Sequence, residues 1–138
     1  MSQSTKVIYT AKAHTIGGRE GTSHTDDGRL QVDLASPGTK REGTNPEQLF
    51  AVGWSACFLS SLELIAGKRK IPFPRDASNH IEVDLCLGAD GASLRVRHNI
   101  SLPGIERNVA QELVRAGHEV CPYSKATRGN IEVETNVL

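Results

Sequence analysis

The sequence predicts an α+β fold organised as a single domain over residues 1–138. Two observations predict it. One apolar stretch, residues 44–66, has the length and composition of a long helix, and the segments around it alternate apolar and polar residues as strands do. The chain length suits one domain. Basic and acidic residues number 16 each, so no net charge favours binding to nucleic acid or to an anionic membrane.

The central helix has signals at both ends. Asn45 is a favoured N-cap, and Pro46 suits the first helical position, where a missing N–H has no consequence. Gly67 stands where a left-handed C-cap residue is expected, and the basic run 68–70 lies at the negative end of the helix dipole. We therefore expect one long helix between Asn45 and Gly67.

This helix is predicted to be buried on every side. Residues 49–59 are apolar or small at all helical positions, unlike the single apolar stripe of a surface helix. We expect no membrane span, because the uncharged run between Glu47 and Glu63 is shorter than the roughly 20 apolar residues that a bilayer requires. The helix is thus the core element, and Cys57 lies near its middle.

Strand signals precede the helix. Residues 7–13 contain enough β-branched and aromatic residues for a first strand, and the glycine-rich turn 17–21 then holds Arg19. The Asp-Gly pair at 27–28 is a hairpin-turn signal, and residues 30–34 alternate as a half-buried strand does. We expect a meander here.

Strand signals resume after the helix. Residues 81–87 and 94–100 alternate on either side of an Asp-Gly turn, which predicts an antiparallel hairpin. Residues 106–118 have the pattern of an amphipathic helix, and residues 131–137 alternate as a last strand. The expected architecture is antiparallel sheets wrapped around the long buried central helix.

Three residues point to redox chemistry. Cys57 alone would be an inert packing residue. Cys121 precedes Pro122 at the predicted N-cap of a short helix, where the dipole and the free N–H groups stabilise a thiolate. Arg19 is a permanent cation that can do the same for a neighbour. A thiolate beside a cation and a second thiol can reduce a peroxide, since one sulfur becomes a sulfenic acid and the other condenses with it to a disulfide.

The other candidate ligands form no pattern. Cys86 is expected to pack in a strand, and the five histidines have no ligand spacing, so no metal site is predicted. No Cys-x-x-Cys pair or apolar leader occurs, so we expect a cytoplasmic protein. Two other functions stay open: a thiol hydrolase or transferase with a Cys/His pair, and a redox-sensing or lipid-binding module that forms a disulfide without turnover.

Two long motifs and the glycine turn resemble the organic hydroperoxide resistance (Ohr) family of the OsmC-like superfamily over essentially the whole chain. The first motif is Asn-Pro-Glu-Gln-Leu-Phe at 45–50, ahead of Ala-Cys-Phe at 56–58. The second is Val-Cys-Pro-Tyr-Ser-Lys-Ala-Thr-Arg-Gly-Asn at 120–130, whose tail is similar to the organic hydroperoxide branch. The resemblance implies the OsmC/Ohr-like fold.

The resemblance also implies roles for four residues. Cys57 would be the peroxidatic cysteine and Cys121 the resolving one, with Arg19 and Glu47 forming an ionic network that holds the thiolate. It implies reduction of organic hydroperoxides, including those of fatty acids, to alcohols, as a defence against organic peroxide stress. The expected reductant is a lipoyl dithiol, either dihydrolipoamide or a lipoylated protein, and no cofactor, metal or haem is expected.

Helix geometry adds the expectation of an intertwined homodimer. Glu47 and Cys57 are ten residues apart, which is about 15 Å along a helix and a different face, too far for both to contact one arginine within that helix. We therefore expect two active sites, each taking Cys57 and Cys121 from one chain and Arg19 and Glu47 from the other. A helix that is apolar all round in so small a domain also favours burial by a partner.

Overall fold

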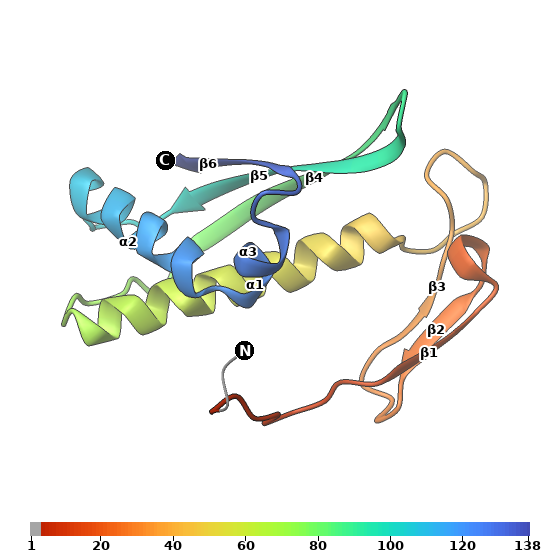
Figure 1. Cartoon of the computed structure of the whole chain (residues 1–138), viewed down its shortest axis with the longest axis horizontal. Coiled ribbons are helices and arrows are strands. Elements are labelled where there is room, and N and C mark those ends of the chain that lie inside the picture. The colour runs from red at the N-terminus through yellow and green to blue at the C-terminus, as the bar shows by residue number, and fades with distance from the viewer. Residues whose placement is uncertain (1–3) are drawn as a thin grey trace. The chain divides into compact units, whose positions relative to one another are not determined.

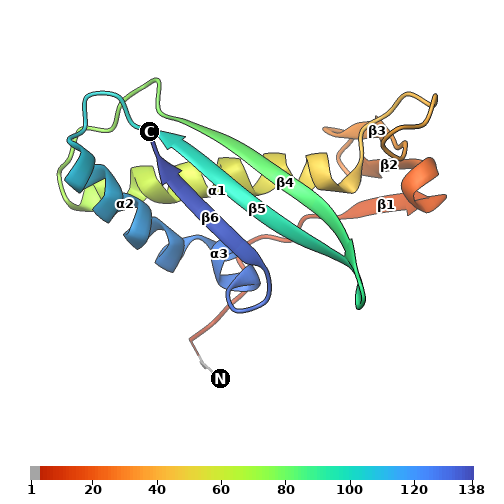
Figure 2. The same cartoon turned by 90° about the horizontal axis from the view of Figure 1, so that it is seen from above.

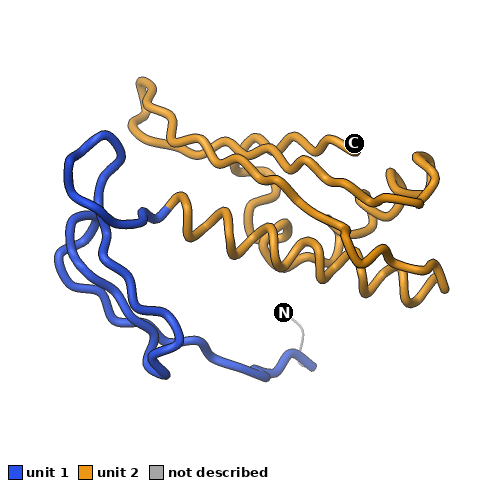
Figure 3. The backbone as a smooth tube through the Cα atoms, turned by 180° about the vertical axis from the view of Figure 1, so that it is seen from behind, with its two compact units in different colours: residues 1–46 blue, residues 47–138 orange. Residues whose placement is uncertain are grey.

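A computed structural model describes residues 4–138, which form two compact units: the first ends at residue 46, and the second comprises residues 47–138 (Figure 3). Residues 1–3, at the start of the stretch in which we expect no signal peptide, lie outside the described part. Each unit has its own three-stranded sheet. The prediction of one domain over 1–138 therefore stays a prediction, and each unit is described separately.

The first unit is a small antiparallel meander. Its elements are β1 (Ala13–Ile16), the short 3₁₀ helix η1 (Gly18–Glu20), β2 (Thr22–Thr25) and β3 (Gln31–Asp33). The strands pair in the order β1-β2-β3. The predicted hairpin turn is confirmed between β2 and β3, where Gly28 takes a φ of 74°. The predicted glycine turn is η1, and it carries Arg19.

The predicted strand at 7–13 is wrong, because β1 begins only at Ala13. A strand needs a neighbour for its backbone groups, and the β1 side of β2, which is four residues long, pairs only with residues 13–16. Val7, Ile8 and Tyr9 are strongly exposed as a result. The β-branched and aromatic residues of this stretch predict a strand, but residues 7–12 have no partner strand in the described chain.

The second unit contains the long helix and a three-stranded sheet (Figures 1 and 2). Its elements are α1 (Pro46–Lys68), β4 (Ser78–Gly88), β5 (Gly91–Ser101), α2 (Arg107–Val120), α3 (Pro122–Thr127) and β6 (Glu132–Val137). The predicted β4–β5 hairpin is confirmed, with Val83 opposite Val96. β6 pairs parallel to β5, so the sheet is mixed rather than antiparallel. The reason is that α2 and α3 form a crossover between β5 and β6.

The second unit has two layers, with α1 and α2 on the same face of the sheet (Figure 2). Apolar side chains from both helices and from β5 form the core between these layers, and Cys121 at the start of α3 belongs to it. The fully buried members are Trp54, Phe58, Leu62, Ala66, Val96, Ile100, Leu113 and Cys121. The predicted central helix is thus confirmed as the element on which the core is built.

The start of α1 at Pro46 is confirmed, but its predicted end is two residues too early. The helix continues through Gly67 to Lys68, and Lys70 takes the left-handed conformation with a φ of 58°. The Ile71 N–H then donates to the Ala66 carbonyl at 2.8 Å and closes the last turn. A lysine therefore occupies the left-handed position that the sequence assigns to glycine.

Within one chain, α1 is buried along a single stripe rather than on every side. Trp54, Phe58 and Leu62 are fully buried, whereas Val52 is 68% exposed and Leu64 is 54% exposed. By length and composition alone α1 passes the criterion for a membrane-crossing helix, as core helices of globular domains also do. The difference from the expectation has a physical reason: the sheet and α2 cover only one side of the helix.

Gly21, which follows η1, allows the chain to close on itself beside Arg19. A methyl group there would overlap the carbonyl oxygen of Ile16 and lie 2.7 Å from the Cα of Gly17. Gly21→Ala is therefore expected to destabilise the turn by on the order of 2 kcal/mol, because backbone atoms cannot move aside cheaply. Hydrogen exchange of residues 16–33 should be faster in this variant.

The matched control for that prediction is Gly67→Ala in α1. A methyl group at Gly67 meets no atom within 4 Å, and alanine is the better helix former by about 1 kcal/mol. Chemical denaturation should therefore show an unchanged or higher stability for Gly67→Ala. Normal hydrogen exchange throughout the meander of Gly21→Ala would contradict the structural account of this turn.

Candidate active site

Two of the predicted site residues, Cys57 and Cys121, lie side by side in the second unit. Cys57 is in the middle of α1, and Cys121 is the N-cap of α3, as predicted. Their Sγ atoms are 3.6 Å apart, and both thiols are free. The Cys121 thiol is fully buried and Cys57 is half-buried. Residues separated by 64 positions in the sequence thus form a dithiol.

The surroundings of Cys57 do not by themselves favour a thiolate. Burial raises the pKa of the Cys57 thiol, and the interaction with the neighbouring Cys121 sulfur raises it further, whereas the backbone N–H of Tyr123 lowers it. The net pKa shift is upward. Activation of this sulfur as a nucleophile therefore requires additional positive charge.

The other two predicted residues lie apart from the sulfur pair along the chain. Arg19 is in η1 of the first unit, and Glu47 is in the first turn of α1. Ten helical residues separate Glu47 from Cys57, about 15 Å along the axis. The four predicted residues are therefore not assembled within the second unit alone.

Cys86 is not part of the dithiol. It lies in β4 of the sheet, opposite Ser93 of β5, whereas the two dithiol sulfurs belong to α1 and to the N-cap of α3. Among residues 4–138 no group of three or more histidine, cysteine and carboxylate side chains could hold a metal ion.

The structure brings two histidines together that the sequence analysis treats as scattered. His98 of β5 is fully buried against Trp54 and Phe58, with ring centroids 4.6 and 5.0 Å away. The His118 ring of α2 lies 4.3 Å from the Phe58 ring and 5.5 Å from that of His98. The inward alternation of β5 was a signal for His98, but nothing in the sequence pairs it with His118.

His98 is held neutral by its surroundings. Burial lowers its pKa to about 4, and the neighbouring His118 lowers it in the same direction. Its Nδ1 lies 2.9 Å from Nδ2 of Asn79, whereas its buried Nε2 has no hydrogen-bond partner among the described residues. A proton added to His98 would therefore be a buried charge without a counter-ion.

This burial predicts a loss of stability in mild acid. The folded pKa lies below the usual value of 6.5, so neutral His98 contributes its full stability above about pH 6.5 and loses it as pH falls toward 4. We expect urea denaturation to give a stability about 2–3 kcal/mol lower at pH 4.5 than at pH 7.5. His98→Asn, which keeps an acceptor for Asn79, should have a flatter pH dependence. An equally steep dependence in this variant would show that His98 is not responsible.

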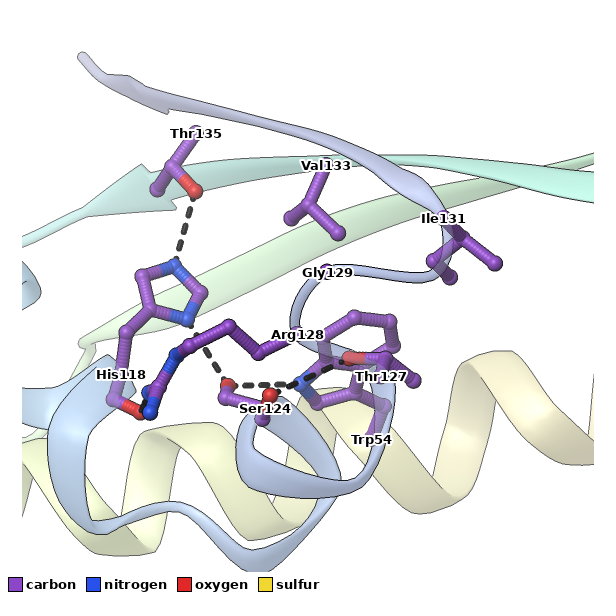
Figure 4. Close-up of a pocket in the computed structure, with 9 residues that line it drawn as sticks. All are labelled: Trp54, His118, Ser124, Thr127, Arg128, Gly129, Ile131, Val133 and Thr135. Carbon is purple, nitrogen blue, oxygen red and sulfur yellow. Dashed lines mark hydrogen bonds between the residues drawn. The ribbon is translucent and has the colours of Figure 1, made fainter.

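A chain of hydrogen bonds connects α3 to its neighbours, and we call its four members the Ser124 network (Figure 4). The Trp54 Nε1–H donates to the Ser124 hydroxyl at 3.2 Å. Ser124 Oγ lies 2.8 Å from Nδ1 of His118, and Nε2 of His118 lies 2.8 Å from the Thr135 hydroxyl. All four side chains line one pocket of about 250 Å³, together with Arg128.

The Cys57–Cys121 pair lies between the long helix α1 and the short helix α3 of this mixed fold, and comparison with known proteins identifies the class as OsmC-like. The family model described as OsmC-like protein matches residues 38–136. The Organic hydroperoxide resistance protein of Xanthomonas axonopodis pv. citri is 41% identical, with 96% of this chain and 96% of that protein covered. Organic hydroperoxide resistance protein OhrB of Bacillus subtilis is 42% identical, with 92% and 96% covered. The chain belongs to the organic hydroperoxide resistance family of OsmC-like proteins.

Solved structures agree with this assignment. A Legionella pneumophila organic hydroperoxide resistance protein has a TM-score of 0.90 and 43% identity, covering 96% of this chain and 98% of its own. A putative organic hydroperoxide resistance protein of Vibrio cholerae has a TM-score of 0.90 and 35% identity, covering 98% and 95%. That structure has captopril bound in one of its active sites. The OsmC/Ohr-like fold predicted from the motifs is confirmed.

Proposed function

We propose that this protein is a cysteine-based peroxidase that reduces organic hydroperoxides, including those of fatty acids, and so protects against organic peroxide stress. The observation that carries the proposal is the pair of free thiols of Cys57 and Cys121 with 3.6 Å between the sulfur atoms. Relatives at about 40% identity are named organic hydroperoxide resistance proteins, which supports the substrate class.

The first chemical step belongs to Cys57. Its thiolate attacks the terminal oxygen of the hydroperoxide, the O–O bond breaks, and the alkoxide takes a proton and leaves as the alcohol. Cys57 is then a sulfenic acid. The half-buried position of Cys57 supports this assignment, because the fully buried Cys121 is less accessible to a substrate.

The second step joins the two sulfurs. The Cys121 sulfur attacks that of Cys57, the S–O bond breaks, and hydroxide leaves as water with the proton of Cys121. In a disulfide the sulfur atoms are about 2.05 Å apart, so the observed separation of 3.6 Å requires only a small approach. The peroxide has then gained two electrons and the dithiol has lost two.

We propose that the site is completed by a second copy of the chain in an intertwined homodimer. Because burial raises the pKa of Cys57, a cation is needed, and Arg19 with Glu47 of the partner chain would supply it and bind the peroxide. The exposed Val52 and Leu64 of α1 and the exposed apolar side chains at 7–9 support burial by a partner.

The disulfide would be reduced from outside. One thiol of a lipoyl dithiol, carried by dihydrolipoamide or a lipoylated protein, attacks the more accessible Cys57 sulfur, which releases the Cys121 thiol and forms a mixed disulfide. The second lipoyl thiol then closes the lipoyl disulfide and releases the Cys57 thiol. Because the cysteines carry the electrons themselves, the proposed cycle uses no bound cofactor and no metal. We assign the protein to the cytoplasm, where a reducing environment returns such cysteines to the thiol form.

The apolar surroundings of the site favour organic over inorganic peroxide. Cys57 and Phe50 both pack against the apolar core, and the Phe50 ring contacts that of Tyr123, with ring centroids 6.2 Å apart. Burying the alkyl group of a substrate gains about 0.8 kcal/mol per methylene. An alkyl hydroperoxide should therefore react faster than hydrogen peroxide.

The hydrolase or transferase alternative is the weaker one. It needs an imidazole that can accept a proton from Cys57, and both nitrogens of His118 are engaged with Ser124 and Thr135. His98 is fully buried and bonded to Asn79. Neither histidine is arranged as a general base toward Cys57.

Turnover with excess reductant tests the proposal. Purified protein, tert-butyl hydroperoxide and excess dihydrolipoamide should yield many equivalents of alcohol per chain, with slower consumption of hydrogen peroxide. Reaction that stops after one equivalent would indicate a redox-sensing module instead. No consumption at all would return Cys57 and Cys121 to the role of packing residues.

A further inference from the structure

The helix that carries Cys121 cannot fix its own position. α3 has six residues, and isolated helices this short are unstable in water. The location of the Cys121 sulfur therefore depends on the contacts that α3 makes with its surroundings. Ser124, one turn after Cys121, is 5% exposed and makes the buried polar contact between α3 and α1.

One arrangement of the Ser124 network gives an acceptor to the polar hydrogens of Trp54, Ser124 and His118 together. An indole nitrogen can only donate, so Ser124 Oγ accepts from Trp54 and its own hydroxyl proton is free to be donated to Nδ1 of His118. Nε2 of His118 then carries the ring proton and donates to Thr135. Burial, followed by the charge of Arg128, lowers the pKa of His118, which supports this neutral form, while Glu119 acts in the opposite direction.

A second contact places α3 on the same turn of α1. Gly53 leaves room for the Tyr123 hydroxyl, since a methyl group at that position would lie 2.7 Å from the Tyr123 oxygen. Gly53 and Trp54 of α1 therefore meet Tyr123 and Ser124 of α3. The Cys57–Cys121 contact lies one turn further along α1, so the sulfur pair follows from how α3 is seated.

We propose that His118 is a positioning residue that holds Cys121 against Cys57 through Ser124, and thereby controls whether oxidised Cys57 forms the disulfide or is oxidised further. The second half rests on the proposed function. In the disulfide route the sulfenic acid and the Cys121 thiol give a disulfide and water. In the competing route the sulfenic acid takes one oxygen from a second hydroperoxide and becomes a sulfinic acid, with release of an alcohol.

A glutathione titration tests the positioning without any peroxide. The equilibrium between the Cys57–Cys121 dithiol and its disulfide, measured at known reduced and oxidised glutathione concentrations, gives the effective concentration of Cys121 at Cys57. Loss of one buried hydrogen bond corresponds to about a tenfold change, so His118→Leu and Ser124→Ala should both lower this concentration about tenfold. His80→Leu, outside the network, should leave it unchanged.

Two conservative variants show whether His118 acts through its contact with Ser124 or through its contact with Thr135. An asparagine amide oxygen can replace Nδ1 toward Ser124, whereas a glutamine amide reaches the position of Nε2 toward Thr135. His118→Asn should therefore restore the effective concentration and His118→Gln should not. Equal values for Asn, Gln and Leu, or a wild-type value for Ser124→Ala, would overturn the proposal. Thermal unfolding identifies a variant that fails to fold. If a His118 variant does so, Ser124→Ala tests the proposal instead, because it removes the same hydrogen bond at its partner in α3.

The second readout is the ratio of sulfinic acid to disulfide that forms from the Cys57 sulfenic acid. After a pulse of tert-butyl hydroperoxide, mass spectrometry should find about tenfold more sulfinic acid per disulfide in His118→Leu than in the wild type, with an unchanged rate of Cys57 oxidation. An equal fall in the oxidation rate would indicate general distortion and contradict a positioning role. If the wild type does not react with hydroperoxide, the proposed function fails, and the glutathione titration still decides the role of His118.

Discussion

Cys57→Ser is expected to lower the turnover of tert-butyl hydroperoxide by about a thousandfold or more, because the hydroxyl of serine is a far weaker nucleophile than a thiolate. The position is half-buried on α1 and close to isosteric for serine, so the fold should be retained. Steady-state alcohol production with excess dihydrolipoamide measures the effect.

Cys121→Ser separates the reaction of Cys57 with the hydroperoxide from the later formation of the disulfide. Because Cys57 is intact, this variant should consume the first equivalent of hydroperoxide at a rate close to that of the wild type. Without the second sulfur, the sulfenic acid persists, and dimedone should trap it on Cys57. Recycling by dihydrolipoamide should be impaired. Cys86→Ser, in β4 and away from the dithiol, is the control that should change neither step. Full turnover in Cys57→Ser would contradict the mechanism.

A mixed dimer of two inactive chains is expected to regain about half of the wild-type activity. In a heterodimer of Arg19→Ala with Cys57→Ser, one site combines the intact cysteine of the first chain with the intact arginine of the second, and the other site lacks both. The reason for the composite site is that α1 separates Glu47 from Cys57 by about 15 Å. Co-expression with two affinity tags isolates the mixed species for a turnover assay.

The matched control combines Arg19→Ala with Glu47→Ala. If Arg19 and Glu47 come from the same chain, this pair leaves each site with one defect, and activity should not return. Restoration in both mixtures would show that the variants are not truly inactive. No restoration in the first mixture would place Cys57 and Arg19 on the same chain and contradict the intertwined arrangement.

The sequence was most informative where local signals and burial agree. Pro46 marks the start of α1, and the alternation of β4 and β5 sets a hairpin with Val83 opposite Val96. The Pro122 signal placed Cys121 at the N-cap of α3. In each case one local signal is sufficient to define the element: a proline at the first helical position for the helices, and alternation of apolar and polar residues for the strands.

The sequence was less informative where the outcome depends on a distant partner. Residues 7–13 have strand composition, but only Ala13 joins a ladder in the described chain, and β6 runs parallel because a helical crossover returns it to β5. The left-handed residue after α1 is Lys70, because the helix continues through Gly67. Strand pairing and helix ends are decided by tertiary contacts that composition does not encode.

The candidate site likewise has features that the sequence predicts and features that depend on tertiary contacts. Motif resemblance identified Cys57 and Cys121, and the fold brings their sulfurs to 3.6 Å. The contact between His98 and His118 could not be inferred, because it depends on how β5 and α2 pack on Phe58. A histidine at an inward position of a strand is an ordinary core residue until its neighbours are known.

The most direct test is the mass of the protein after one equivalent of tert-butyl hydroperoxide. The account predicts that the denatured wild type loses the mass of two hydrogen atoms, and that peptide mapping links Cys57 to Cys121 with Cys86 still free. Cys86→Ser should give the same result. An unchanged mass, or a disulfide that includes Cys86, would contradict the claim that Cys57 and Cys121 are the redox-active pair.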